Sequence, residues 1–235
     1  MRIIDSLKEM TETARGWLAG GSVGFVLVKG ELHEGHLQLI QEAQKACEIS
    51  VVGLLGCCWP FATPEERVQY QHNLQGQLQI LGRYQQLVVF IPRFEEMYPA
   101  RFQTLLMLAG SPLDQLSESE KEYNRSLFTL TVKLFHLVRP DVVYFGQKDA
   151  LQLAILRQVI LDLNIDVHLR MMPTVRESDG LALSNRNRLL SDGERQAAVL
   201  VYSALQAGRT LIMQGERHSS VIGQAMLRIL QSNAL

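Results

Sequence analysis

Apolar residues near the start of the chain fall into two kinds of pattern. Short runs rich in β-branched and aromatic residues, VGFVLV at 23–28 and ISVVGLL at 49–55, are typical of strands. Between them, over 36–47, apolar residues recur at helical spacing, at Leu37, Ile40, Ala43 and Cys47. With a loop at 30–35, this order forms a strand–loop–helix–strand unit. Continuous apolar strands in such a unit predict a parallel sheet covered by helices on both faces.

The same alternation continues until about Pro173. The expected strands are 86–92, 141–146 and 166–173, and the expected helices begin at Thr63 or span 122–138 and 149–164. Only helices are expected after that: one from the capping box of Ser191 and Glu194 through Leu211, and one over 219–231. We therefore predict an α/β fold with a doubly wound parallel sheet in a domain of residues 1–173, followed by a small, mostly helical C-terminal segment of residues 174–235.

The first 17 residues predict an amphipathic helix rather than a secretory signal, because charged residues interrupt the apolar ones. Its apolar side is expected to comprise Ile3, Ile4, Leu7 and Met10. No apolar run in the sequence is long enough to span a bilayer. The N-terminal region is therefore expected to belong to the folded domain.

Composition and charge are those of an ordinary globular protein. Of the 235 residues, 47% are hydrophobic and 20% charged, and 23 basic residues nearly balance 24 acidic ones. No basic block stands out, so neither nucleic acid nor an anionic membrane is an expected partner. The three cysteines, Cys47, Cys57 and Cys58, fit a reducing compartment better than a disulfide framework, because their number is odd and two are adjacent. We expect a soluble cytoplasmic protein.

The clearest candidate chemistry lies where the first expected strand gives way to a helix. In VKGELHEGHLQL two histidines, His33 and His36, stand three residues apart with Gly35 between them. A zinc site is disfavoured, because the HExxH pattern needs a spacing of four within a helix and the adjacent cysteines lack the spacing of zinc ligands. These residues alone leave two alternatives open. One is a structural pair in a surface loop or helix cap, and the other is a phosphate site.

The position of the histidines favours the phosphate site. A glycine-bearing loop between a strand end and a helix start presents unpaired backbone N–H groups and the positive end of the helix dipole. Imidazole donors there can bind phosphate oxygens and stabilise the charge that develops on them during transfer. Gly35 would keep the backbone between the two rings unobstructed.

Two further polar segments follow expected strands and should meet the histidines at the same edge of the sheet. YFGQKDALQL places Lys148 and Asp149 directly after a strand, and PTVRESDGLALSNRNRLLS carries Ser184, Arg186 and Arg188 after the next one. Taken singly, each residue also has a structural interpretation as a solvated charge, a helix N-cap or a turn residue. Together the three segments predict a site for a polyphosphate.

The three motifs, in this order, resemble the pantothenate synthetase (pantoate–β-alanine ligase) family. That family carries an HxGH loop, a YFGxKDxxQ segment and a PTVRExDGLAxSSRN segment. LVRPDVVYFGQKD and PTVRESDGLALSNRNRLLS match it nearly residue for residue, EEMYP also fits, and FVLVKGELHEGHLQLI matches less fully. The resemblance covers essentially the whole chain. It implies a Rossmann-like fold of the nucleotidyltransferase type and a homodimer.

The resemblance also implies a reaction and roles for residues. Pantoate is activated by ATP with Mg²⁺ as an enzyme-bound acyl adenylate, and the amine of β-alanine then displaces AMP. His33 and His36 would contact the triphosphate and stabilise the transition state, and Lys148 would neutralise phosphate charge. Ser184 and Arg186 would belong to a mobile loop that binds the phosphates, and Gln152 would contact pantoate. The implied nucleotide contacts come from Gly35, Gly146, Asp149 and Val175.

This chemistry explains why the sequence shows no pattern of a protein nucleophile. A carboxylate that attacks an α-phosphate meets like-charge repulsion, so the protein must supply cations and hydrogen-bond donors rather than a nucleophile. Histidine, lysine and arginine side chains around one polyphosphate meet that need.

The chain departs from the family pattern on the acid-binding side. The first motif reads LVKGELHEGH where the family usually has PTMGALHEGH, so Lys29 replaces the methionine over the substrate. Pro60 stands where a pantoate-binding glutamine is expected, and Glu120 where an arginine is expected. Proline has no side-chain donor for such a contact. Lys29 is therefore a candidate to pair with the substrate carboxylate.

The C-terminal segment also differs from the family pattern. The family's C-terminal domain normally continues into a small sheet, whereas two helices are expected here before Leu235, so we expect a shortened lid. Two alternatives to pantoate ligation stay open. One is an adenylate-forming relative that acts on another small carboxylic acid, and the other is a catalytically weakened nucleotide-binding relative.

Overall fold

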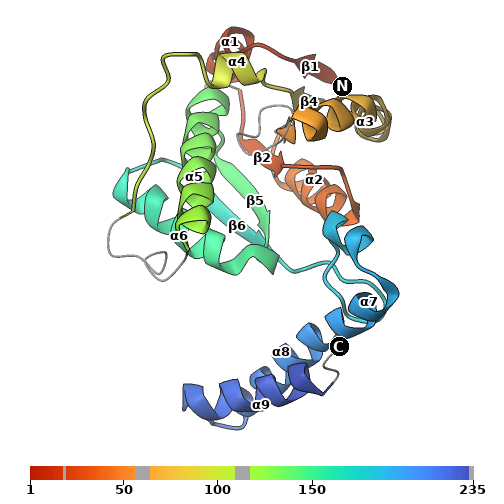
Figure 1. Cartoon of the computed structure of the whole chain (residues 1–235). Helices are drawn as coiled ribbons and strands as arrows, with labels where there is room; N and C mark the ends of the chain where they lie inside the picture. The colour runs from red at the N-terminus through yellow and green to blue at the C-terminus, as the bar shows by residue number, and fades with distance from the viewer. Residues whose placement is uncertain (18–19, 57–63, 109–116, 233–235) are drawn as a thin grey trace. The chain divides into compact units, whose positions relative to one another are not determined.

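A computed structural model of the chain describes residues 1–17, 20–56, 64–108 and 117–232 (Figure 1). The chain divides into two compact units, Met1–Pro173 and Thr174–Leu235. The first unit contains a six-stranded sheet, and the second is mostly helical. None of the helices in the described part of the chain is both long and apolar enough to cross a membrane.

The sheet of the first unit is parallel throughout, with the strand order β1-β4-β3-β2-β5-β6. Its strands are β1 (Arg2–Ile4), β2 (Val23–Val28), β3 (Ile49–Leu54), β4 (Leu87–Phe90), β5 (Val142–Gly146) and β6 (His168–Met172). From β2 the chain adds β3 and β4 on one side, and later β5 and β6 on the other. This reversal of direction is the topological switch point of a doubly wound sheet, and it confirms the predicted fold class.

Helices cover both faces of this sheet. They are α1 (Leu7–Trp17), α2 (Glu34–Ala46), α3 (Pro64–Leu81), the short α4 (Phe94–Met97), α5 (Glu118–Val138) and α6 (Ala150–Asp162), with the 3₁₀ turn η3 (Gln147–Asp149) before α6. Successive side chains of a strand point to opposite faces, so Phe25 packs in the core formed with α1, α5 and α6, and Val26 packs in the core formed with α2 and α3. All six residues of β2 are buried, as the continuous apolar run predicts.

The second unit contains η4 (Asn185–Leu189), α7 (Asp192–Ala198), α8 (Leu200–Met213) and α9 (Ser219–Gln231). Helices α8 and α9 pack closely, because Gly208 of α8 has no side chain: a Cβ there would lie 2.8 Å from Sδ of Met226. Two capping boxes seen in the structure have clear sequence signals, Ser117 with Glu120 at the start of α5 and Ser191 with Glu194 at the start of α7.

The N-terminal 17 residues do not form one helix, so that prediction was wrong. Residues Arg2–Ile4 form the edge strand β1, paired with β4, and the backbone N–H of Ile91 donates to the carbonyl of Ile4 at 2.8 Å. Ile4 is fully buried whereas Ile3 is 46% exposed, which is the alternation of a strand. Helix α1 begins only at Leu7 because Ser6 caps it, accepting from the backbone N–H of Glu9 at 3.2 Å.

Other helices also differ from their predicted bounds, and α5, for example, begins at Glu118 rather than at residue 122. The helix expected from Ser191 through Leu211 is divided at Val199 into α7 and α8, and nothing in the structure explains the division. Helix α2 begins at Glu34 rather than His36, so Gly35 lies inside its first turn and not in a loop. Of the cysteines, Cys47 is a buried free thiol, whereas Cys57, Cys58 and Pro60 lie outside the described residues.

Candidate active site

Two of the three expected motifs meet at the switch point of the sheet. Lys29 directly follows β2, and the neighbouring strand β5 ends at Gly146 and leads into η3 with Lys148 and Asp149. Because β2 and β5 are paired and parallel, their carboxyl ends lie at the same edge of the sheet. This edge is where doubly wound sheets bind ligands. The first unit therefore provides the framework of a site at this point.

The two histidines lie at the start of α2. His33 is the N-cap, with extended backbone (φ −141°, ψ 168°), and its carbonyl accepts from the backbone N–H of His36 at 2.8 Å and of Leu37 at 3.2 Å. One helical turn brings the His36 side chain under that of His33. Their rings stack, with centroids 3.8 Å apart and an interplanar angle of 20°. The three-residue spacing in the sequence thus produces a compact imidazole pair at a helix N-terminus.

Both imidazoles are kept neutral by their surroundings. Burial is the main cause that lowers the pKa of His36 to about 3, and His33, Lys29 and Lys148 contribute to the shift. Burial, followed by the charge of Lys148, also lowers the pKa of His33. The Nδ1 atom of each ring is buried and has no hydrogen-bond partner within the described ranges. A buried polar atom without a hydrogen-bond partner destabilises the folded protein. A ligand that forms hydrogen bonds with these two atoms would therefore gain binding free energy.

Two ammonium groups lie near the imidazole pair. Lys29 donates from Nζ to Oε1 of Gln152, on α6, at 3.3 Å. Nζ of Lys148 lies 3.9 Å from Oδ1 of Asp149, and the two side chains are 40% and 48% exposed. Both lysines are close enough to His36 to influence its pKa. The site therefore combines two cations with two neutral imidazoles, which suits a polyanionic ligand.

Sequence reasoning missed two side chains that hold the loop before His33. Gln77 of α3, only 5% exposed, accepts from the backbone N–H of Leu32 through Oε1 at 3.2 Å. One turn earlier on the same helix, Asn73 donates from Nδ2 to the carboxylate of Glu31. Two amides four residues apart on a helix are common, so this pair gives no distinctive signal in the sequence.

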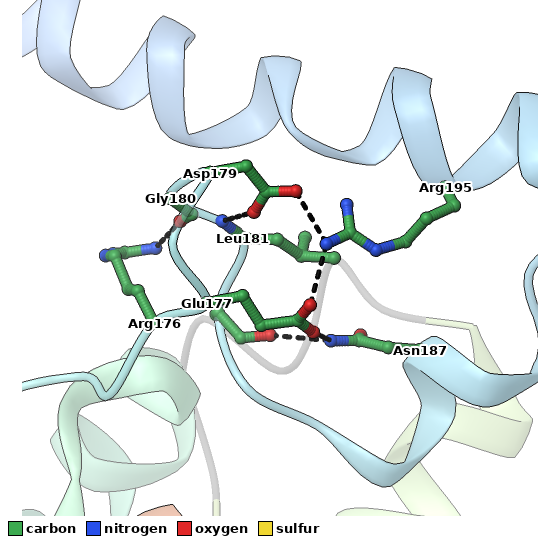
Figure 2. A network of polar contacts seen from close by, with 8 residues as sticks. Arg176, Glu177, Asp179, Gly180, Leu181, Asn187 and Arg195 are labelled. Atoms are coloured by element: carbon green, nitrogen blue, oxygen red, sulfur yellow. Dashed lines mark hydrogen bonds and ion pairs between the residues drawn. The ribbon is translucent and has the colours of Figure 1, made fainter.

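The third motif lies in the second unit. Val175 and Leu183 face each other across a turn, and the carbonyl of Val175 accepts from the backbone N–H of Leu183 at 2.9 Å. Ser184 then caps η4, and its Oγ accepts from the backbone N–H of Arg186 at 3.3 Å. The Arg186 side chain is exposed. Figure 2 shows the polar contacts that hold this turn.

A protein cage for a metal ion is not formed by the described part of the chain, where no group of three or more His, Cys, Asp and Glu side chains is gathered. The donors at the switch point are instead nitrogens of lysine and histidine. Such a set suits phosphate oxygens rather than a hard cation, because magnesium prefers oxygen ligands.

Comparisons with known proteins identify the family. The sequence model of the family "Pantoate-beta-alanine ligase" matches residues 2–234. The pantothenate synthetase of Thermosipho africanus is 39% identical over 231 residues, which are 98% of this chain and 83% of that protein. The pantothenate synthetase of Heliobacterium modesticaldum is also 39% identical, over 100% of this chain and 84% of its own length.

Solved structures agree with the sequence comparison. The crystal structure of pantothenate synthetase from Thermus thermophilus superposes with a TM-score of 0.84 at 35% identity, covering 99% of this chain and 83% of that one. A ligase from Francisella tularensis, complexed with a β,γ-ATP compound and β-alanine, shares the fold with a TM-score of 0.76 at 24% identity. Sequence and fold both match over nearly the whole chain. The chain therefore belongs to the pantoate–β-alanine ligase family.

Proposed function

We propose that this chain condenses pantoate with β-alanine, using ATP. The pantoate carboxylate attacks the α-phosphorus of ATP, forming a carboxyl–phosphate bond and releasing pyrophosphate. The amine of β-alanine then attacks the acyl carbon of the pantoyl adenylate, and AMP leaves as pantothenate forms. The observation that carries the proposal is the neutral, stacked pair of His33 and His36 beside Lys29 and Lys148 at the switch point of the sheet.

The arrangement suits the first step of this reaction. Two anions must approach each other, so fixed positive charges lower the electrostatic cost, and donors aimed at the phosphate stabilise the charge of the transition state. We assign Lys148 to phosphate charge and His33 and His36 to phosphate oxygens. A neutral imidazole can donate one hydrogen bond without gaining a proton, so it can act as a donor at neutral pH.

The other assignments rest on the family resemblance and on position. Gly146 and Asp149 flank Lys148 at the end of β5, and Gly35 lies between the two histidines in α2, so all three suit nucleotide contacts. We assign contacts with the nucleotide and its phosphates to Val175, Ser184 and Arg186 of the second unit. We further propose that residues 1–173 are the nucleotide-binding domain and residues 174–235 a lid. Magnesium would enter with the ATP phosphates and supply charge neutralisation there. The resemblance also supports a cytoplasmic homodimer.

Pyrophosphate exchange tests the proposed reaction directly. Labelled pyrophosphate should enter ATP when pantoate is present, without β-alanine, because the adenylate step is reversible. Exchange with another small carboxylic acid but not with pantoate would show that the substrate is different. Binding of ATP without exchange for any acid tested would contradict ligase activity.

Lys29 is expected to set the affinity for the acid. Changing Lys29→Met removes the ammonium group beside Gln152, so the KM for pantoate should rise about tenfold or more, whereas the KM for ATP should change less than about twofold. Steady-state kinetics with each substrate varied in turn measures both values. The matched control is Lys45→Met, because Lys45 is 69% exposed and pairs with Glu42 on the surface of α2. An unchanged KM for pantoate would remove Lys29 from the acid site.

A further inference from the structure

The turn between Val175 and Ser184 has a well-defined geometry. Arg176 and Ala182 form an antiparallel bridge, and the backbone N–H of Glu177 donates to the carbonyl of Leu181 at 2.8 Å. Gly180 occupies the left-handed region with φ +96°, and a Cβ there would overlap Cδ1 of Tyr202. Glycine is therefore required at the tip, where the turn approaches α8.

The carboxylates of Glu177 and Asp179 in this turn converge on Arg195 of α7 (Figure 2). A single guanidinium nitrogen, Nη2, donates to Oε2 of Glu177 at 2.7 Å and to Oδ2 of Asp179 at 2.6 Å. The other carboxylate oxygen of Glu177 accepts from Nδ2 of Asn187 at 2.8 Å. Arg195 is the main cause that holds the pKa of Glu177 below its ordinary value, and Asn187 contributes. The carboxylate of Glu177 thus links α7 to η4.

The same contacts restrain the segment that carries Ser184 and Arg186. Asn187 donates from Nδ2 to the carbonyl of Ala182 at 3.0 Å as well as to Glu177. Its backbone N–H donates to the carbonyl of Ser184 at 3.1 Å. Ser184 and Arg186 therefore lie between two anchored points, Ala182 and Asn187. The restraint reaches them through Glu177 and Asn187 rather than from Arg195 directly.

We propose that Arg195 is a positioning residue for phosphate binding, which holds the Ser184–Arg186 segment in its binding shape through Glu177 and Asn187. The phosphate role of that segment rests on the function proposed above, but the restraint itself does not. Without the guanidinium, the two ion pairs that hold the turn to α7 would be lost, and the carboxylates of Glu177 and Asp179 would repel each other within the turn. The segment would then have to be ordered by the nucleotide, which would weaken nucleotide binding.

Substitutions of Arg195 test this role in two ways. Arg195→Met keeps much of the aliphatic length but removes the charge, and should lower kcat/KM for ATP about 10- to 30-fold. The KM values for pantoate and β-alanine should change less than about threefold. Arg195→Lys should stay within about threefold of wild type for ATP, because one nitrogen makes both contacts and an ammonium can replace it. Arg2→Met, which removes an exposed ion pair with Glu9, is the control.

Amide hydrogen exchange gives a readout that does not depend on activity. The backbone N–H groups of Leu183 and Asn187 should exchange at least about tenfold faster in Arg195→Met, and at the wild-type rate in the control. Glu177→Gln, which keeps the side-chain shape, should show the same direction of change and serves if Arg195→Met fails to fold. Unchanged exchange in both variants would overturn the proposal, as would equal kinetic losses for all three substrates. Fast exchange with no effect of Ser184→Ala on ATP kinetics would instead remove the phosphate role of the segment.

Discussion

Replacing His36 by glutamine is expected to lower kcat of the ligase reaction about 100- to 1000-fold. The physical reason is that His36 is a neutral, half-buried donor at a helix N-terminus, held in place by stacking on His33 before the substrate arrives. Loss of one preorganised donor to a developing anion typically costs two to three orders of magnitude in rate, on the order of 3–4 kcal/mol. Single-turnover release of pyrophosphate from ATP and pantoate measures the adenylation step.

The matched control is His136→Gln, because His136 is exposed on α5. That variant should keep the wild-type kcat. A His36→Gln enzyme that retains a tenth or more of the wild-type kcat would show that His36 does not act in the chemical step. The change in KM for ATP should be smaller than the change in kcat, since the contact is expected to strengthen in the transition state.

Acidification is expected to destabilise the protein before most carboxylates titrate. Above pH 6.5 the imidazoles of His33 and His36 are neutral in both the folded and the unfolded chain and contribute no pH dependence. Below pH 6.5 the unfolded chain takes up protons that the folded chain excludes until the pH approaches the folded pKa of His36, about 3. The free energy of unfolding should therefore decrease as the pH falls, by more than about 1 kcal/mol per pH unit.

Urea unfolding at several pH values between 7.5 and 5 measures how the free energy of unfolding depends on pH. This range is chosen because ordinary carboxylates stay ionised across most of it. Carboxylates such as Glu177, whose pKa is lowered by Arg195, act in the same direction, but only below their ordinary value of 4.5. The His36→Gln variant should therefore show a shallower pH dependence in this range. If the free energy of unfolding depended on pH equally in the variant and the wild type, His36 could be protonated without loss of the fold.

The acid-binding side is where this family member differs most from the expected pattern. Lys29 and Gln152 are in direct contact, so the residue that departs from the family motif touches the residue assigned to pantoate. Pro60 lies outside the described residues, and Glu120 accepts from Ser117 in the capping box of α5. Glu120 therefore has a structural role at a helix start, whereas the contact of Lys29 with Gln152 supports the role in the choice of acid that we propose for Lys29.

Local patterns were enough to predict the fold class and that two of the polar motifs lie at one edge of the sheet. Strands β2 and β5 are continuous apolar runs, and the polar residues that follow them, Lys29 and Lys148, come to one edge because parallel strands end on the same side. The pairing of His33 with His36 followed from a three-residue spacing at a helix start. These features depend on residues close together in the sequence, which is why the sequence alone could predict them.

The remaining features depend on contacts between distant parts of the chain, so only the tertiary structure decided them. Strand β1 has three residues, too few for a periodic signal, and exists because Arg2–Ile4 pair with 88–90 of β4. Gln77 holds Leu32 across 45 positions of sequence, and the neutral state of His36 depends on burial that no local pattern reports. Burial and long-range hydrogen bonding arise only when separate elements pack, and this packing sets the protonation and rigidity of the site.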